Sequence, residues 1–317
     1  MYNIGIDLGG TNIAVGVIDE NNNIVGRGKI KTGKDYSSDE IMIDMAEASK
    51  MAVADAGITM ADICYVGIAA PGNINPETGY IIYANNINFE KYNAVKKMRE
   101  LLGIEKCYIA NDANAAAYGE LLAGAGRGSK NFVTVTLGTG VGTGIIIDRK
   151  IYTGSNFVGS EAGHMMILAG GERCTCGNFG CWEAYASATA LLRQTKEAMQ
   201  NHPSTKMWDI AGGLDSVTGR TAFDAMKKGD LVAKRVVEQY IDYVSIGIVN
   251  LVNIFQPELI CIGGGICNEG ETLLSPIRKY INEHDYNRNP DVRVKLCCAE
   301  LSNDAGIIGA GNLYKLA

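Results

Sequence analysis

The sequence predicts an α/β protein built from two similar lobes with a cleft between them. Short apolar, strand-like runs alternate with longer runs of helical spacing along the chain. The chain opens with a strand, a glycine turn and another strand, and the same pattern recurs after Asn131, which indicates an internal duplication. The length of 317 residues is also more than one compact core usually holds.

Elements of the first half follow from apolar runs and the residues that end them. A helix is expected to begin at Asn111-Asp112, and a loop-rich stretch joins Pro71-Gly72 to about Asn88. Helical spacing extends over Ser38–Ala56 and Tyr92–Leu102, each followed by a glycine. The strand-like runs are Tyr2–Leu8, Ile13–Ile18, Ile24–Ile30, Ile63–Ala69 and Lys106–Ala110.

In the second half, helices are expected from Ser187 and after Asp304. We expect a smaller lobe of residues 1–111 plus 303–317 and a larger lobe of residues 112–302. No Pro/Ser-rich linker separates the lobes, so they are expected to share a hinge near residues 110–113. The strand-like runs of this half are Phe132–Leu137, Thr143–Ile147 and Leu259–Ile262.

Composition excludes several classes of protein. Apolar residues make up 47% of the chain and charged residues 20%, as in soluble globular proteins. A net charge of -6 without a basic stripe argues against a nucleic-acid partner. No apolar run reaches the ~18 residues of a membrane helix, and no signal peptide precedes the first strand, so we expect a cytoplasmic protein. An odd number of cysteines, nine, argues against a disulfide framework.

Two glycine turns are candidate phosphate sites. The first is Asp7-Leu8-Gly9-Gly10-Thr11-Asn12, and the second is Gly138-Thr139-Gly140. Glycines let backbone amides approach a phosphate closely, and successive amides form a concavity that binds anions. Asp7 is expected to hold Mg²⁺, through water, because this ion keeps much of its hydration shell. Each turn alone also suits an ordinary hairpin; the two together favour phosphate binding.

Asn111-Asp112 opens a helix directly after a strand. The positive end of the helix dipole favours an ionised carboxylate there, and such a carboxylate can accept a hydroxyl proton during phosphoryl transfer. Plain helix capping is the alternative interpretation. Gly263-Gly264-Gly265 follows another strand, and a glycine run outside the carboxyl end of a strand suits a flat adenosine.

A cysteine cluster predicts a metal centre. Cys174, Cys176 and Cys181 lie within eight residues, and His164 precedes them by ten. Three thiolates and one imidazole complete a tetrahedral zinc site, so the zinc would be structural, without an open position for catalysis. Glycines between the cysteines disfavour the alternative of three free core thiols. Glu161, His164 and Glu183 flank the cluster and carry groups that hold vicinal sugar hydroxyls.

At these motifs the chain resembles the ROK family, named for its repressors, open reading frames and kinases. The matching motifs occur in the family's order over nearly the whole chain. They are Asp7-Leu-Gly-Gly-Thr11, Ala70-Pro71-Gly72, Asn111-Asp112-Ala-Asn114, Leu137-Gly-Thr-Gly140, Gly159-x-Glu161-x-Gly163-His164, Cys174-x-Cys176-Gly-x-x-Gly180-Cys181-x-Glu183 and Gly263-Gly-Gly265.

The resemblance implies a two-lobed actin-like ATPase/hexokinase (ribonuclease H-like) fold and an ATP-dependent sugar kinase, most similar in pattern to bacterial glucokinases. It implies that Asp112 deprotonates the sugar 6-hydroxyl and that His164 serves both zinc and sugar. It also implies a homodimer or homotetramer, with the dimerisation surface in the larger lobe. The implied sugar ligands are Asn111, Asp112, Glu161, His164 and Glu183, with Gly72 and Asn86 lining the pocket; the implied nucleotide ligands are Asp7, Gly9, Gly10, Thr11, Asn12, Gly138, Thr139, Gly140, Gly264 and Gly265.

Departures from the family pattern leave alternatives open. Residues 86–89 read Asn-Ile-Asn-Phe where related kinases often have Asn-Leu-Gly-Trp, and larger residues stand at Phe157, Val158 and Ser160. These changes lie near the implied sugar site. The substrate is therefore expected to be glucose or, alternatively, N-acetylmannosamine, allose, mannose or fructose. A sugar-sensing repressor is disfavoured because family repressors carry a helix-turn-helix domain before the first glycine motif. A catalytically silent sugar-binding protein is disfavoured by Asp112 and the two turns.

Overall fold

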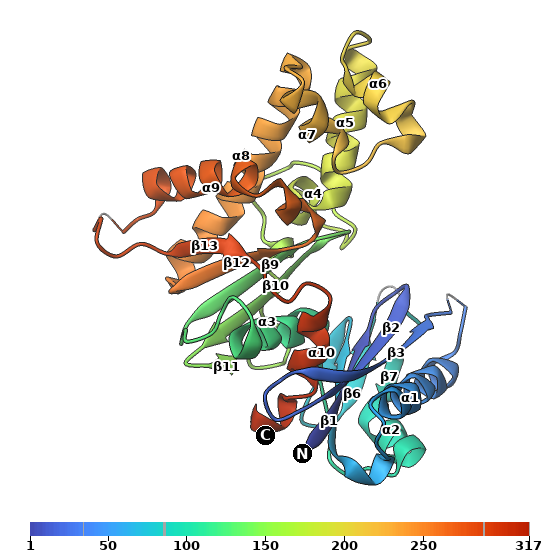
Figure 1. Cartoon of the computed structure of the whole chain (residues 1–317). Coiled ribbons are helices and arrows are strands. Elements are labelled where there is room, and N and C mark those ends of the chain that lie inside the picture. Colours follow the sequence, from blue (N-terminus) through green and yellow to red (C-terminus); the bar gives the residue numbers. More distant parts are fainter. Residues whose placement is uncertain (34, 85–86, 288, 317) are drawn as a thin grey trace. The chain divides into compact units, whose positions relative to one another are not determined.

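The chain divides into two compact units in the computed structural model, which describes residues 1–33, 35–84, 87–287 and 289–316 (Figure 1). Unit 1 comprises Met1–Thr134, Gly144–Ser160 and Ala299–Ala317, and unit 2 comprises Val135–Thr143 and Glu161–Cys298. This division differs from the lobes expected from the sequence, because the helix that begins at Asp112 packs within unit 1.

Unit 1 is organised by a five-stranded sheet of order β3-β2-β1-β4-β8. β1 pairs antiparallel with β2 and parallel with β4, and β4 pairs parallel with β8. The carboxyl ends of three parallel strands therefore meet at one edge. The strands are β1 (Tyr2–Leu8), β2 (Asn12–Ile18), β3 (Ile24–Lys31), β4 (Ile63–Ala70) and β8 (Cys107–Asn111).

Helices pack against both faces of this sheet. Ile4 and Ile6 of β1 share an apolar core with α1 (Ser38–Asp55) and α2 (Ala94–Leu102). Gly5 points to the opposite face, because side chains alternate along a strand. A Cβ there would overlap the Ile307 carbonyl of α10 (Asp304–Ala310), which packs against α3 (Asp112–Ala123).

The predicted loop-rich stretch before residue 88 was wrong in part. It contains β5 (Asn73–Asn75) and β6 (Tyr80–Tyr83), which form a small antiparallel sheet with β7 (Glu90–Asn93). Strands of three or four residues are too short to show an alternation. The helix expected from Tyr92 begins later, at Ala94, because the Asn93 side chain accepts a hydrogen bond from the Lys96 amide and caps it.

A second five-stranded sheet has the order β11-β10-β9-β12-β13. Like the first sheet, it opens with a hairpin across a glycine turn and ends with two strands from later in the chain, which agrees with the predicted duplication. β10 begins at Val141, two residues before the predicted start. The strands are β9 (Phe132–Leu137), β10 (Val141–Ile147), β11 (Lys150–Ile151), β12 (Leu259–Gly263) and β13 (Lys295–Cys298).

Most of the remaining helices belong to unit 2 and pack around α8 (Leu231–Phe255), which contacts α4, α5, α7 and α9. No helix among the described residues is long and apolar enough to span a lipid bilayer. The others are α4 (Glu183–Ala186), α5 (Ala188–Asn201), α6 (Met207–Ala211), α7 (Thr221–Lys227), α9 (Glu271–His284), and the short 3₁₀ turns Met60–Asp62, Ala162–His164, Leu214–Ser216, Gly265–Glu269 and Leu313–Leu316.

The close backbone contact between α3 and α10 predicts that a side chain added there destabilises the protein. A Cβ on Gly309 would overlap the Ala115 carbonyl, whereas a Cβ on Gly219 would meet no atom within 4 Å. We expect Gly309→Ala to lower the free energy of unfolding by about 1–3 kcal/mol, the usual cost of overpacking. The matched change Gly219→Ala should stay within about 0.5 kcal/mol. Urea unfolding of the two variants would measure this, and equal stabilities would contradict the close contact.

Candidate functional site

Two acidic residues lie at the carboxyl edge of the unit 1 sheet. Asp7 of β1 pairs with Ala69 of β4, and Ala69 pairs with Ala110 of β8. Asp112 follows Ala110 by two residues and opens α3. The two carboxyl groups, separated by about a hundred residues in sequence, therefore lie at the same edge of the sheet.

Burial perturbs both carboxyl groups. It raises the pKa of Asp7 to about 7, and the negative charge of Asp112 contributes in the same direction. Gly306 of α10 packs closely against Asp7: a Cβ added at this glycine would lie 2.8 Å from the Asp7 carboxyl group. Burial also raises the pKa of Asp112, while the Ala113 amide, which donates to Asp112 Oδ1 at 2.8 Å, partly offsets this rise. Two half-buried carboxyl groups of this kind favour a nearby cation or a bound proton.

Asn111 fixes the entry to α3. Its Oδ1 accepts hydrogen bonds from the amides of Ala113 and Asn114, at 3.0 and 3.3 Å, so it caps the helix as its position suggested. Its Nδ2 donates to the Gly72 carbonyl at 3.1 Å. Gly72 has a φ of +96° and lies against the Tyr83 carbonyl, which excludes a side chain. Three predicted sugar-site residues, Gly72, Asn111 and Asp112, thus come together; Asn86 lies outside the described residues.

The first glycine turn presents open backbone. The Gly9 amide donates to the Asn12 carbonyl at 3.0 Å, which closes the turn. Thr32 holds it from the side, since its amide donates to the Thr11 carbonyl at 3.0 Å and its hydroxyl to the Gly9 carbonyl at 2.7 Å. Gly10 is exposed, and a Cβ there would meet nothing within 4 Å. Sequence reasoning missed Thr32, because no motif marks a residue at the end of the third strand.

The second glycine turn is held by the start of α5. The Gly138 amide donates to the Gly140 carbonyl at 3.0 Å. The Ala188 amide donates to the Gly138 carbonyl, and the Thr189 hydroxyl to the Thr139 carbonyl, both at 2.8 Å.

The predicted adenosine glycines adjoin this turn through β9. Gly264 has a φ of +102° and packs against the Leu137 carbonyl at the end of β9, which excludes a side chain. Gly265 follows with open space around it. The Gly138–Gly140 turn and the Gly264 turn therefore lie at the ends of β9 and β12 within unit 2.

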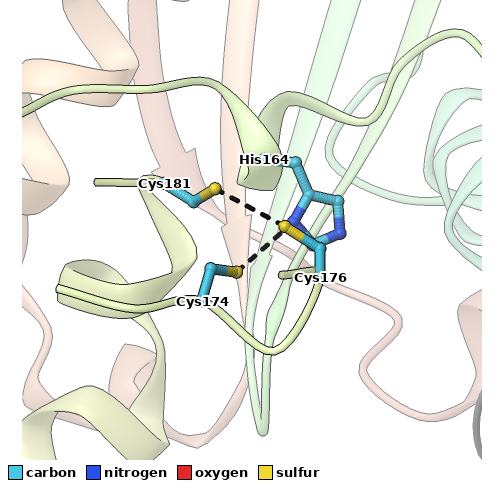
Figure 2. Close-up of side chains that lie close together, drawn as sticks. All are labelled: His164, Cys174, Cys176 and Cys181. Atoms are coloured by element: carbon cyan, nitrogen blue, oxygen red, sulfur yellow. Dashed lines mark hydrogen bonds between the residues drawn. The ribbon is translucent and has the colours of Figure 1, made fainter. Parts of the chain in front are cut away.

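The four predicted metal ligands converge in unit 2. One ligand atom from each of His164, Cys174, Cys176 and Cys181 lies within 4.8 Å of the others. Figure 2 shows the three sulfurs and the imidazole pointing toward one another. The Nδ1 of His164 is 3.7 Å from the Cys174 sulfur. The sulfurs of Cys176 and Cys181 are also 3.7 Å apart.

The donor set fits a tetrahedral metal ion. A Zn–S bond of about 2.3 Å implies ligand atoms about 3.8 Å apart, close to the separations found. Burial raises the pKa of the Cys181 thiol, and a coordinated metal ion would favour the thiolate instead. Turns at Gly177 and Gly180, with φ of +94° and +79°, fold the loop. Gly180 also packs against the Leu168 carbonyl, where a side chain would clash.

The two glutamates predicted to bind the sugar, Glu161 and Glu183, lie in different environments. Glu161 is exposed, and its carbonyl accepts from the His164 amide at 3.0 Å. Glu183 opens α4 and has both carboxylate oxygens engaged by the chain: Oε2 accepts from the Val141 amide at 2.9 Å, and Oε1 accepts from the Thr175 hydroxyl at 3.1 Å. Neither Val141 nor Thr175 was identified from the sequence, because a backbone amide and a single threonine carry no motif.

The predicted site residues form one set in each unit. Unit 1 contains the acidic pair, the first glycine turn and the Asn111–Gly72 contact. Unit 2 contains the metal cluster, both glutamates, the second glycine turn and the Gly264 turn.

Comparisons with known proteins agree over nearly the whole chain. The sequence profile of the ROK family matches residues 3–316. A glucokinase of Halalkalibacterium halodurans is 36% identical over 98% of this chain and 94% of its own length. A solved ROK family glucokinase from Streptomyces griseus, in complex with glucose and AMPPNP, is 33% identical with a TM-score of 0.84 and full coverage of both chains.

A repressor is also similar to this chain. A xylose repressor of Caldicellulosiruptor bescii is 31% identical over 89% of this chain, which spans 70% of the repressor. The relatives that resemble this chain therefore include both glucokinases and a repressor.

The raised pKa of Asp7 predicts a pH dependence of stability. Its folded pKa, about 7, exceeds its ordinary value of 3.8, so the neutral acid is favoured in the folded state, and this contribution is lost as the pH rises toward 7. In metal-free buffer, Asp7→Asn should gain stability relative to wild type between pH 4 and 8, by up to about 4 kcal/mol. Denaturant unfolding across that range measures the gain. The exposed Asp215→Asn serves as control, and a pH-independent difference for Asp7→Asn would contradict the burial effect.

Proposed function

The chain belongs to the ROK family, and from this premise we propose that it is an ATP-dependent hexose kinase with glucose as its foremost substrate. The reaction would transfer the γ-phosphoryl group of ATP to the sugar 6-hydroxyl and release ADP. The observation that carries the proposal is the half-buried Asp112 at the start of α3, next to Asn111 and its contact with Gly72. The similarity to glucokinases supports the choice of sugar.

In this proposal Asp112 is the general base. A carboxylate whose pKa is raised by burial takes up a proton more readily than an exposed one, which suits a group that receives the hydroxyl proton as the phosphoryl group arrives. Asn111 positions the hydroxyl beside it, because its own side chain is anchored to the Gly72 carbonyl. Positioning and charge stabilisation supply most of the catalysis in phosphoryl transfer.

The two glycine turns would hold the ATP phosphates through backbone amides other than those of Gly9 and Gly138, which close the turns themselves. In unit 1 this role falls to residues 9–12, and in unit 2 to residues 138–140. Asp7 would hold Mg²⁺, which supplies positive charge to the phosphates. A cation beside Asp7 would offset the rise in the pKa of this carboxyl group, because positive charge favours its ionised form. Gly264 and Gly265 would lie beside the adenosine.

A structural zinc is proposed at the Cys₃His cluster. All four positions of a tetrahedron would be filled by protein atoms, so the ion would organise the loop without touching the reaction. His164 faces the cluster with Nδ1, which leaves Nε2 for a sugar hydroxyl. Glu161 and Glu183 would complete the sugar contacts. A homodimer or homotetramer and a cytoplasmic location are further expectations from the sequence, and they remain predictions.

One observation favours a second candidate function. The similarity to a xylose repressor suits a sugar-binding protein without catalysis. The raised pKa of Asp112 and two open glycine turns argue for the kinase, because a sugar sensor needs neither a base nor phosphate sites. Among kinases, N-acetylmannosamine, allose, mannose and fructose remain alternative substrates.

Release of ADP from Mg-ATP tests the proposal against glucose, N-acetylmannosamine, N-acetylglucosamine, mannose, allose and fructose. We expect the highest kcat/KM with glucose. We also expect Asp112→Asn to lower kcat by about 10²–10⁴-fold, on the scale of losing a general base, while nucleotide binding and thermal stability are retained.

The outcomes separate the alternatives. A higher kcat/KM for another hexose would leave the kinase assignment and change the substrate. Silence with every sugar, in protein that binds nucleotide, would support the sensor. Normal turnover by Asp112→Asn would remove that residue from the mechanism; the exposed Asp215→Asn is the matched control and should retain full activity.

Metal analysis tests the zinc assignment. Purified protein should contain about one zinc per chain, and Cys181→Ser should lose it, because three remaining donors bind zinc far more weakly. The sugar KM should rise in that variant, since the loop also carries His164. Cys64→Ser, outside the cluster, should keep the metal. Full zinc content in Cys181→Ser, or unchanged sugar affinity after verified zinc removal, would contradict this role.

A further inference from the structure

A short segment connects the metal cluster to the second glycine turn. Residues 181–189, here called the bridge segment, begin with the metal ligand Cys181 and continue through α4 into α5. The bridge segment contacts the turn and the residue after it at three points, all within unit 2. These are Glu183 to the Val141 amide, the Ala188 amide to the Gly138 carbonyl, and the Thr189 hydroxyl to the Thr139 carbonyl.

Glu183 also reaches back to the metal loop. While its Oε2 accepts from Val141 at 2.9 Å, its Oε1 accepts from the hydroxyl of Thr175, which lies between the ligands Cys174 and Cys176. One carboxylate therefore joins the loop to the first residue of β10. A Cβ on Gly140 would overlap Glu183 Oε2, so the glycine leaves room for this contact.

The bridge segment is anchored in the core of unit 2. Trp182 is fully buried, and its Nε1 donates to the Tyr243 carbonyl of α8 at 2.8 Å. Gly247 of α8 makes room for the Trp182 ring, since a Cβ there would overlap it. Trp182 is therefore fixed between Cys181 and Glu183, and the side chain of Glu183 links the metal loop to the residue after the glycine turn.

We propose that the metal loop controls nucleotide affinity, because Thr175 and Glu183 transmit its position to the second glycine turn. The inference rests on the proposed role of that turn as a phosphate site. Thr175 and Glu183 act here as positioning residues: Thr175 orients the carboxylate, and the carboxylate holds the amide next to the turn. With the metal removed, the loop loses its folded geometry, the Thr175–Glu183 contact is lost, and the turn becomes less ordered before it binds phosphate.

The test measures the Kd of Mg-AMPPNP by calorimetry, without sugar, so that any sugar contact of Glu183 does not enter. We expect zinc-loaded wild type to bind about 10-fold more tightly than zinc-stripped wild type, the scale of one hydrogen bond to a charged group. Thr175→Val keeps every metal ligand and should weaken binding about 3–10-fold with full zinc content. Glu183→Ala should weaken it at least as much and make it insensitive to zinc.

Two matched variants complete the design. Glu183→Gln should retain most of the affinity, because the amide oxygen can accept from Val141 while its NH₂ donates to the Thr175 hydroxyl. Thr272→Val, at an exposed position of α9, should behave as wild type.

Each result bears on one proposal. Equal Kd values for loaded, stripped, Thr175→Val and Glu183→Ala protein would overturn the inference and leave the kinase assignment intact. A zinc effect that persists in Glu183→Ala would also overturn it, since the coupling would then bypass the carboxylate. Failure of zinc-loaded wild type to bind Mg-AMPPNP would instead count against the proposed kinase.

Discussion

Direct contact between helix backbones is the constraint on which unit 1 depends. α10, from the end of the chain, lies on α3 and on β1 at positions where only glycine fits, including Gly5, Gly119 and Gly309. The contact holds the C-terminal helix against the first strand and leaves space beside Gly306 for the Asp7 carboxyl. It also fixes α3, whose first residue is Asp112. The half-buried acidic pair lies beside this contact, in which two distant helices approach without side chains between them.

The two units stabilise their site residues by different physical means. In unit 1 the carboxyl groups are held by regular strands and helices, and burial makes their ionised forms costly, which prepares them for a cation or a proton. In unit 2 the cysteine loop has little regular structure, so its geometry depends on four converging ligand atoms and on turns that glycines permit. A metal ion can supply there the order that a hydrophobic core supplies elsewhere.

Much of the fold could be predicted from the sequence because apolar periodicity and end signals agree over long elements. The first strand was predicted with its observed bounds, and Asn111 and Ser187 cap the helices that they were expected to open. The small sheet before α2 was missed, since strands of three or four residues show no period. The lobe boundary placed after Asn111 also differs from the compact units, because no local signal reveals that α3 packs on α10.

The sequence by itself determined the chemistry of the candidate site: which side chains are acids, which are thiols, and where glycines leave the backbone open. Those properties are local, so spacing and residue type suffice to infer them. Only the tertiary structure decided which of these groups meet and what their surroundings do to them. The rise in the Asp7 pKa comes from burial, and the contact of the Glu183 carboxylate with Val141 joins segments 42 residues apart in sequence. Such contacts arise from packing of the whole chain, and no local pattern of residues encodes them.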